Sequence, residues 1–195
     1  MDSPLNLKMK DAEVIYYPNF FNIKQANNYF NSLLNTINWK QDTITVYGKI
    51  HLQPRLTAFY ATNAKSYSYS NIIMHPNLFE GDLLKIKNNI EAQLNINFTS
   101  CLANLYRDGK DSNGWHSDNE KELGTQPIIA SISFGAERIF HFKHKLDKNL
   151  KTKLVLKHGS LLLMAGATQE NWLHQIPKTT KPIGQRINLT FRIIA

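Results

Sequence analysis

The sequence is poor in cysteine and in long hydrophobic runs. Its 195 residues include one cysteine, Cys101, which excludes an internal disulfide and fits a reducing compartment. Cys101 lies in an apolar run, so we expect a buried, unreactive thiol. No apolar run is long enough to span a bilayer, and Met1–Pro4 lacks the basic-then-apolar layout of a signal peptide. These absences predict a soluble intracellular protein of the cytoplasm or nucleus that does not contact a membrane.

Acidic residues are also scarce: 15 Asp and Glu face 23 Lys and Arg, which gives a formal net charge of +8. A small basic protein attracts polyanions, and nucleic acid is the commonest soluble one. The alternative is that the lysines only keep the surface soluble, and charge alone does not decide between the two. The length, the 42% hydrophobic content and the lack of repeats or linkers predict one domain over 1–195. We expect a monomer.

The hydrophobic pattern changes from helical to strand-like along the chain. Apolar positions at helical spacing predict helices at 23–37, with Asn22 as N-cap, and near 79–94. From residue 101 onward short apolar stretches predict strands at 101–106, 127–134, 138–144, 152–157, 160–165, 171–176 and 186–194. Strands in close succession without helices between them predict an antiparallel sandwich or barrel.

A candidate metal site begins at His116 and Asp118, at the end of the polar, turn-rich segment 107–115. In an extended backbone alternate side chains share a face, so the imidazole and the carboxylate point the same way. His174 is the best third ligand. Two histidines and one carboxylate leave one face of an octahedron open, as in non-haem Fe(II) oxygenases. Taken alone the pattern is also compatible with solvated polar residues in a loop.

The last predicted strand carries a row of polar residues. Residues 186, 188, 190 and 192 alternate with apolar neighbours, so Arg186, Asn188, Thr190 and Arg192 share one face. If this face is buried it needs an anion, and a guanidinium can pair with a carboxylate through two hydrogen bonds. If it is solvated, the apolar face alone forms core. Periodicity does not choose between the two.

Three tyrosines are candidates for contact with a partner. Tyr47 lies at the turn of a hairpin predicted over 43–52, where an aromatic ring is exposed unless something covers it. Tyr67 and Tyr69 share a face if their segment is extended, which would suit base stacking. Packing of each ring against its own sheet is the alternative.

Several stretches together resemble the AlkB family of Fe(II)- and 2-oxoglutarate-dependent nucleic-acid dealkylases. They occur in the family's order between about Pro54 and Arg192. They are Asn104–Tyr106, Trp115–Glu120, Pro127–Ala136, His158–Met164 and Arg186–Arg192. Pro54–Ala58 and Tyr67–Ser70 resemble the branch that acts on methylated DNA or RNA bases. The first 50 or so residues resemble the family only loosely, and the family often has an acid where this sequence has Asn119.

The resemblance implies an α+β fold with a double-stranded β-helix (jelly-roll) core and N-terminal helices packed on one sheet. Residues 1–75 would form a substrate-recognition lid and the first helix, and 76–195 a helix and the core. The implied activity is oxidative demethylation of 1-methyladenine and 3-methylcytosine in alkylated DNA, with RNA as a further substrate. It consumes 2-oxoglutarate and O₂ and releases formaldehyde, succinate and CO₂, as in DNA alkylation repair.

The resemblance also implies roles for individual residues. His116, Asp118 and His174 would hold Fe(II). Arg192 would pair with the distal carboxylate of 2-oxoglutarate, in a pocket completed by Asn104, Tyr106, Arg186 and Asn188. Tyr69 and the His116 ring would enclose a flipped base, with Tyr67 beside them and Glu120 facing its polar or charged edge. Tyr47 resembles an aromatic finger that fills the gap left in a duplex.

Two other functions compete with this one. A 2-oxoglutarate-dependent hydroxylase of a protein or small molecule would need neither Tyr69 nor Glu120. A non-catalytic nucleic-acid-binding jelly roll would bind single strands without Asp118.

Overall fold

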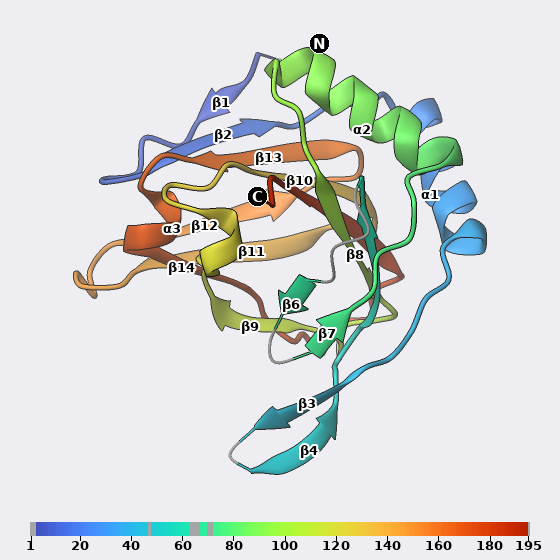
Figure 1. Cartoon of the computed structure of the whole chain (residues 1–195). Coiled ribbons are helices and arrows are strands. Elements are labelled where there is room, and N and C mark those ends of the chain that lie inside the picture. The colour runs from blue at the N-terminus through green and yellow to red at the C-terminus, as the bar shows by residue number, and fades with distance from the viewer. Residues whose placement is uncertain (1–2, 47, 63–66, 70–71, 195) are drawn as a thin grey trace.

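The computed structural model describes residues 3–46, 48–62, 67–69 and 72–194, and two antiparallel sheets form the centre of this part (Figure 1). The larger sheet runs in the order β1 (Leu5–Asn6), β2 (Glu13–Tyr17), β13 (Ser160–Ala165), β10 (Ile129–Gly135), β15 (Arg186–Arg192), β8 (Ser100–Tyr106) and β5 (Leu56–Ala61). The smaller sheet runs in the order β12 (Lys151–Leu156), β11 (Arg138–His144), β14 (Trp172–Ile176) and β9 (Asn113–His116). The predicted double-stranded β-helix core is confirmed.

Two long helices cover the outer face of the larger sheet. They are α1 (Ile23–Thr36) and α2 (Gly81–Leu94), which lie together on one side of the molecule (Figure 1). Buried Leu33 of α1 and Ile86 of α2 belong to the same hydrophobic cluster as Leu189 of the sheet. The prediction that the N-terminal helices pack on one sheet is therefore confirmed. None of the helices in the described chain is long and apolar enough to cross a membrane.

The strand β15 is buried on both faces. Its apolar residues Ile187, Leu189 and Phe191 are fully buried in the cluster beneath the helices. Its polar residues face the space between the two sheets and are also buried, each at most 7% exposed. The solvated alternative for the polar row is therefore wrong, and these groups need partners inside the protein.

The rest of the space between the sheets is filled by a second hydrophobic cluster. It includes Phe142 and Trp172 from the smaller sheet and Ile129, Leu162 and Met164 from the larger one. The polar row of β15 thus lies beside a tightly packed apolar interior.

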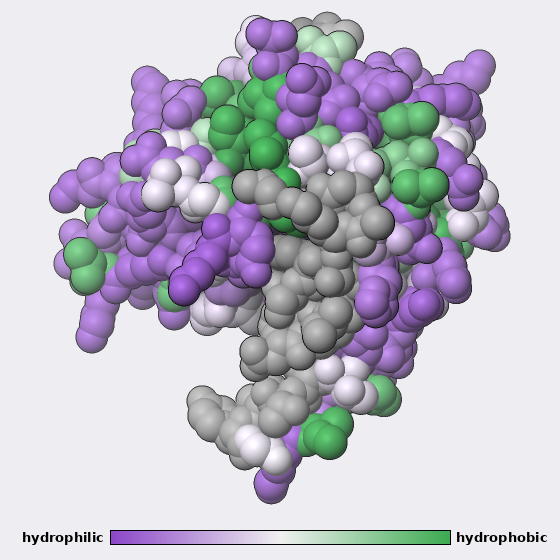
Figure 2. Space-filling view, viewed as in Figure 1, coloured by the Kyte–Doolittle hydropathy of each residue, from purple (hydrophilic) through white to green (hydrophobic). Residues whose placement is uncertain are grey.

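Two hairpins lie outside both main sheets. They are β3–β4 (Thr43–Val46 and Lys49–Leu52), which projects at the bottom of Figure 1, and β6–β7 (Tyr67–Tyr69 and Ile72–Met74). The predicted hairpin over 43–52 is confirmed, but Tyr47 lies outside the described residues. On β4, Ile50 is 75% and Leu52 63% exposed. Hydrophilic residues dominate the surface on this side of the molecule, while hydrophobic residues gather in its upper middle and also occur at the bottom, on the projecting hairpin (Figure 2).

The predicted strands from residue 101 onward are all found, with boundaries shifted by up to two residues. An additional strand, β9, occupies the end of a segment expected to be only a polar loop. The larger sheet also crosses the expected boundary at residue 75, because β1, β2 and β5 are part of it. Residues 1–75 therefore supply core strands as well as the two hairpins.

The start of α1 offers a direct test of local sequence signals. Asn22 accepts a hydrogen bond from the Gln25 amide at 2.9 Å, and the Gln25 side chain accepts one from the Asn22 amide at 3.2 Å. Asn22→Ala removes a side-chain cap, so we expect a loss of about 1 kcal/mol in the free energy of unfolding. Asn28→Ala, in the exposed middle of the helix, is the control and should not destabilise. Equal losses in urea unfolding of the two variants would contradict the capping role.

Candidate metal centre

The structure brings His116, Asp118 and His174 together. The strands β9 and β14 pair so that His116 lies opposite His174, and Asp118 follows two residues beyond His116. Each residue offers one ligand atom, and these three atoms all lie within 4.8 Å of one another. His174 Nε2 lies 3.8 Å from Asp118 Oδ2, which leaves room for an ion between them. In the part of the chain that the structure describes, no other such group is found.

The protonation states of the three side chains suit a divalent cation. Burial lowers the pKa of His174 to about 3 and also lowers that of His116, so both imidazoles are neutral at pH 7. Burial alone would raise the pKa of Asp118, but Arg192 and the two histidines outweigh it and lower the pKa to about 2. His116 Nδ1 lies 2.7 Å from the Gly114 carbonyl, which favours the tautomer with the proton on Nδ1 and the lone pair on Nε2, the atom that also faces Asn113 Nδ2 at 3.2 Å.

Asp118 is held from two sides. Its Oδ1 accepts a hydrogen bond from Arg192 Nη2 at 2.7 Å, and both side chains are buried. Its backbone amide donates to Gln169 Oε1 at 3.0 Å. The carboxylate is therefore oriented by contacts from β15 and from the short helix α3 (Thr168–Asn171) that precedes β14.

Arg186 lies at the other end of the polar row, in the same cavity. Arg186 and Arg192 are six positions apart on β15, which is roughly 20 Å along an extended strand. Arg186 Nη2 donates to Ser133 Oγ at 2.9 Å, and its guanidinium carbon lies 5.1 Å from the centre of the Tyr106 ring. Its Nε and Nη1 are buried without a hydrogen-bond acceptor among the described residues. Burial lowers the pKa of Arg186 to about 10, which still leaves it charged at pH 7.

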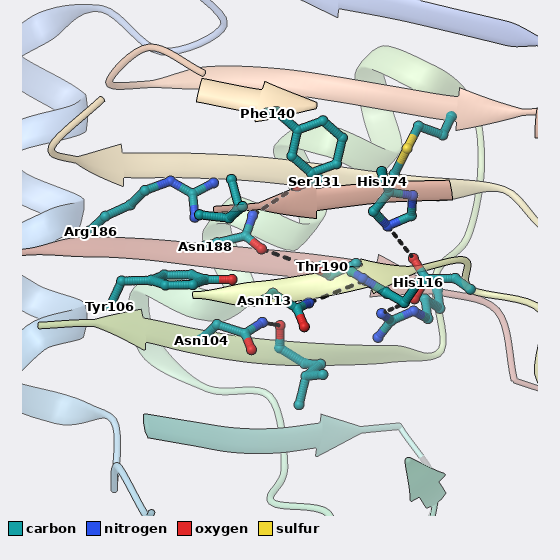
Figure 3. A pocket seen from close by; sticks show the side chains of 15 residues that line it. Asn104, Tyr106, Asn113, His116, Ser131, Phe140, His174, Arg186, Asn188 and Thr190 are labelled. Atoms are coloured by element: carbon teal, nitrogen blue, oxygen red, sulfur yellow. Dashed lines mark hydrogen bonds and ion pairs between the residues drawn. The ribbon is translucent and has the colours of Figure 1, made fainter. Parts of the chain in front are cut away.

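The polar residues between the two arginines form a connected network (Figure 3). Asn188 donates through Nδ2 to Ser131 Oγ at 2.8 Å and to the Ile132 carbonyl at 3.0 Å. Thr190 donates to Asn188 Oδ1 at 3.1 Å. On the adjacent strand β8, Asn104 Oδ1 accepts from Arg55 Nε at 2.8 Å. These contacts fix the side chains that line the cavity before any ligand is bound.

The positions of the two arginines differ from the expectation that Arg192 binds a distal carboxylate. Arg192 is beside the candidate metal ligands and donates to one of them, whereas Arg186 lies at the far end of the strand with two donor atoms, Nε and Nη1, that meet no acceptor among the described residues. The alternation along the strand predicts that both face inward, but it does not say which partner each one meets.

The structure also adds residues that sequence reasoning did not select. The cavity is lined further by Leu102, Asn113, Ser131, Phe140, Met164 and Ile176. Asn113 Nδ2 lies 3.2 Å from His116 Nε2, and Arg55 and Gln169 support the lining from behind. Arg55 lies within Pro54–Ala58, a stretch that resembles the AlkB family, so the sequence offered a signal for it. No sequence pattern singled out Gln169 or Asn113.

The structure describes only some of the residues that are expected to contact the substrate. Glu120 immediately precedes the 3₁₀ turn Lys121–Leu123, two residues beyond Asp118, and is half-buried. Tyr67 and Tyr69 lie in β6, of which only the backbone is described.

Known proteins match this chain along most of its length. Residues 13–192 match the 2OG-Fe(II) oxygenase superfamily. The alpha-ketoglutarate-dependent dioxygenase alkB homolog 3 of Homo sapiens is 42% identical over 94% of this chain and 66% of its own length. The DNA oxidative demethylase ALKBH2 of Arabidopsis thaliana is 35% identical over 94% of this chain and 67% of its own length. The chain belongs to the AlkB homologue family within that superfamily. It spans slightly less than two thirds of the alkB homolog 3 proteins.

Solved structures share the fold at low sequence identity. The structure of OsALKBH1 matches with a TM-score of 0.68 and 18% identity, covering 98% of this chain and all of that one. A prolyl hydroxylase from Trichoplax adhaerens matches with a TM-score of 0.63 and 10% identity, over 93% of this chain and 83% of that one. This chain therefore shares its fold with OsALKBH1 and with that prolyl hydroxylase.

Family membership implies Fe(II) and 2-oxoglutarate, and the cavity fits both. Two neutral imidazoles and an ionised carboxylate are a donor set for Fe(II). The unused donors of Arg186 suit a carboxylate of the co-substrate.

For the metal-free protein we expect the free energy of unfolding to fall as the pH drops below 6.5. His174 has a pKa of about 3 in the fold against a usual 6.5, so unfolding takes up a proton in this range. The stabilisation is complete above 6.5 and is lost toward pH 3, with a slope that approaches about 1.4 kcal/mol per pH unit.

Urea unfolding between pH 7 and pH 5, with a chelator present, measures this slope. His174→Asn removes the group with the largest contribution and should make the pH dependence shallower, with the part due to His116 remaining. His51→Asn, on the exposed β4, is the control and should leave it unchanged. An unchanged slope in His174→Asn would contradict the assignment.

Proposed function

We propose that this chain is an Fe(II)- and 2-oxoglutarate-dependent dioxygenase that removes methyl groups from N-alkylated bases. The substrates are 1-methyladenine and 3-methylcytosine in DNA, with RNA as a further substrate, and the biological role is alkylation repair. One observation supports it above the others: a metal-ligand group and a buried arginine with unused donors share one cavity in an AlkB homologue.

In this proposal His116, Asp118 and His174 bind Fe(II) on one face and leave the opposite face open. Bound iron with 2-oxoglutarate and O₂ supplies the oxidising power for removal of the methyl group as formaldehyde, with succinate and CO₂ as co-products. The chain's own part is to keep both histidines neutral, Asp118 ionised and water largely out of the cavity.

Arg186 takes the distal carboxylate of 2-oxoglutarate, and Ser133 and Tyr106 position its guanidinium. Asn188 and Asn104 line the path between that carboxylate and the metal. Arg192 holds Asp118 in place. This division differs from the expected role of Arg192, because Nε and Nη1 of Arg186 have no acceptor among the described residues, whereas Arg192 donates to Asp118.

Substrate recognition in this proposal depends on residues near the mouth of the cavity. Glu120 carries a carboxylate two residues beyond Asp118 in the chain, and the favoured lesions are cationic bases that it would attract. Tyr69 and the His116 ring enclose the flipped base, Tyr67 lies beside them, and Tyr47 enters the duplex. All five of these substrate contacts, the monomeric state and the location in cytoplasm or nucleus stay predictions.

The competing functions are less well supported. A prolyl hydroxylase shares the fold, which is compatible with hydroxylation of a protein or small molecule. A shared fold at 10% identity, however, does not identify the substrate. A non-catalytic binding domain gives no physical reason to bury Arg186 with two unused donors.

The metal site is tested by Asp118→Ala. Loss of the anionic ligand should abolish formaldehyde and succinate release on a methylated oligonucleotide, while oligonucleotide affinity stays nearly unchanged. His174→Ala is the second variant, because Asp118→Ala also leaves the Arg192 charge without its partner. Asp82→Ala, in the exposed ion pair of α2, is the matched control and should keep full turnover. Undiminished product from Asp118→Ala and His174→Ala, quantified by mass spectrometry, would refute the function.

The co-substrate site is tested by Arg186→Lys, which keeps the charge and removes the planar fork. Loss of a hydrogen bond to a charged group costs about 1.5–3 kcal/mol, so the KM for 2-oxoglutarate should rise by roughly 10- to 150-fold. Arg107→Lys, in a partly exposed pair with Asp111, is the control and should leave that KM unchanged. If instead Arg192→Lys raises the KM for 2-oxoglutarate and Arg186→Lys does not, Arg192 binds the distal carboxylate, as the family resemblance implied.

A further inference from the structure

Gln169 is almost completely buried, at 1% exposure, yet it lies outside every motif identified above. It belongs to α3, which joins β13 to β14 and ends immediately before the strand that carries His174. Its position among the metal residues therefore needs a physical explanation.

The short helix α3 is anchored on two sides, once through a side chain and once through its backbone. Thr168 Oγ1 accepts a hydrogen bond from the Glu13 amide of β2 at 2.9 Å. The Gln169 carbonyl accepts one from Lys145 Nζ at 2.8 Å. These bonds tie α3 to β2 of the larger sheet and to the residue that follows β11 of the smaller one. They therefore fix the backbone position from which the Gln169 side chain extends.

From this position the Gln169 side chain reaches the loop beyond β9. Its Oε1 accepts the hydrogen bond from the Asp118 amide at 3.0 Å, and its Nε2 lies 3.6 Å from Met164 Sδ. The two ends of the amide are not interchangeable, because a flipped amide would place its NH₂ group against another N–H donor. The contact therefore requires a hydrogen-bond acceptor at the position that the end of a glutamine side chain reaches.

We propose that Gln169 is a positioning residue for the carboxylate ligand of the metal site. Strand pairing aligns His116 with His174, but Asp118 lies beyond the end of β9. The bond from Gln169 fixes the backbone of Asp118, and Arg192 then sets the direction of its carboxylate. Because α3 leads directly into β14, the carboxylate is held in register with His174. The inference rests on the metal site of the proposed function and not on its substrate.

The experiment measures the Kd for Mn(II) by calorimetry on the metal-free full chain. Gln169→Met keeps the side-chain length and removes the acceptor, and Gln169→Asn withdraws the amide by one carbon–carbon bond, roughly 1.5 Å. Both should bind Mn(II) about 10- to 100-fold more weakly, the usual effect of removing a hydrogen-bond partner of a metal ligand. Gln169→Glu keeps an acceptor of the right length and should retain an affinity close to that of the unmodified chain.

The matched control is Gln175→Met, one residue beyond His174 on β14. Its side chain points away from the cavity, toward His141 at 3.5 Å, so Mn(II) affinity should not change. If Gln169→Met does not fold, Gln169→Asn decides the question. Unchanged Mn(II) affinity in Gln169→Asn, or an equal loss in Gln169→Glu and Gln169→Met, would overturn the proposal.

Unfolding of the metal-free variants separates positioning from packing. A role in packing alone would lower their urea midpoints and leave the Mn(II) Kd unaltered, which would also overturn the proposal. Demethylation is not part of the readout. If the unmodified chain binds Mn(II) but releases no formaldehyde with Fe(II), the proposed function fails and this inference stands.

Discussion

The burial of β15 on two chemically opposite faces is the constraint on which the rest of the structure depends. Its apolar face needs a hydrophobic cover, and α1 and α2 provide it. Its polar face needs hydrogen-bond partners and counter-charges, and the smaller sheet encloses it so that water cannot supply them. The fold therefore converts one alternating strand into both the main hydrophobic core and the lining of the site.

Charge explains why this lining suits a metal together with a dianion. Arg55, Arg186 and Arg192 are buried around the cavity, and Asp118 is the one fully buried carboxylate among the described residues that line it. A divalent cation alone would add to an excess of positive charge. A dicarboxylate offsets that charge and satisfies the unused donors of Arg186, so each ligand improves the electrostatic environment of the other.

Much of this could be predicted from the sequence, because the relevant signals are local. Asn22 with Gln25 identifies the start of α1, and strict alternation over 186–192 identifies a strand with a polar face. The metal ligands followed from the spacing of His116 and Asp118 and from the family resemblance. The helix predicted near 79–94 begins at Gly81, and Phe79 lies before it, with its ring against Tyr60 and Phe191.

What the sequence could not provide depends on contacts between distant segments. Gln169 meets Asp118 across 51 residues, and Arg55 meets Asn104 across 49. Periodicity showed that Arg186 and Arg192 share a face, but their roles depend on which neighbour each one reaches. The strand β9 forms from a polar sequence because β14 offers it a pairing edge, and tertiary pairing here overrides local propensity.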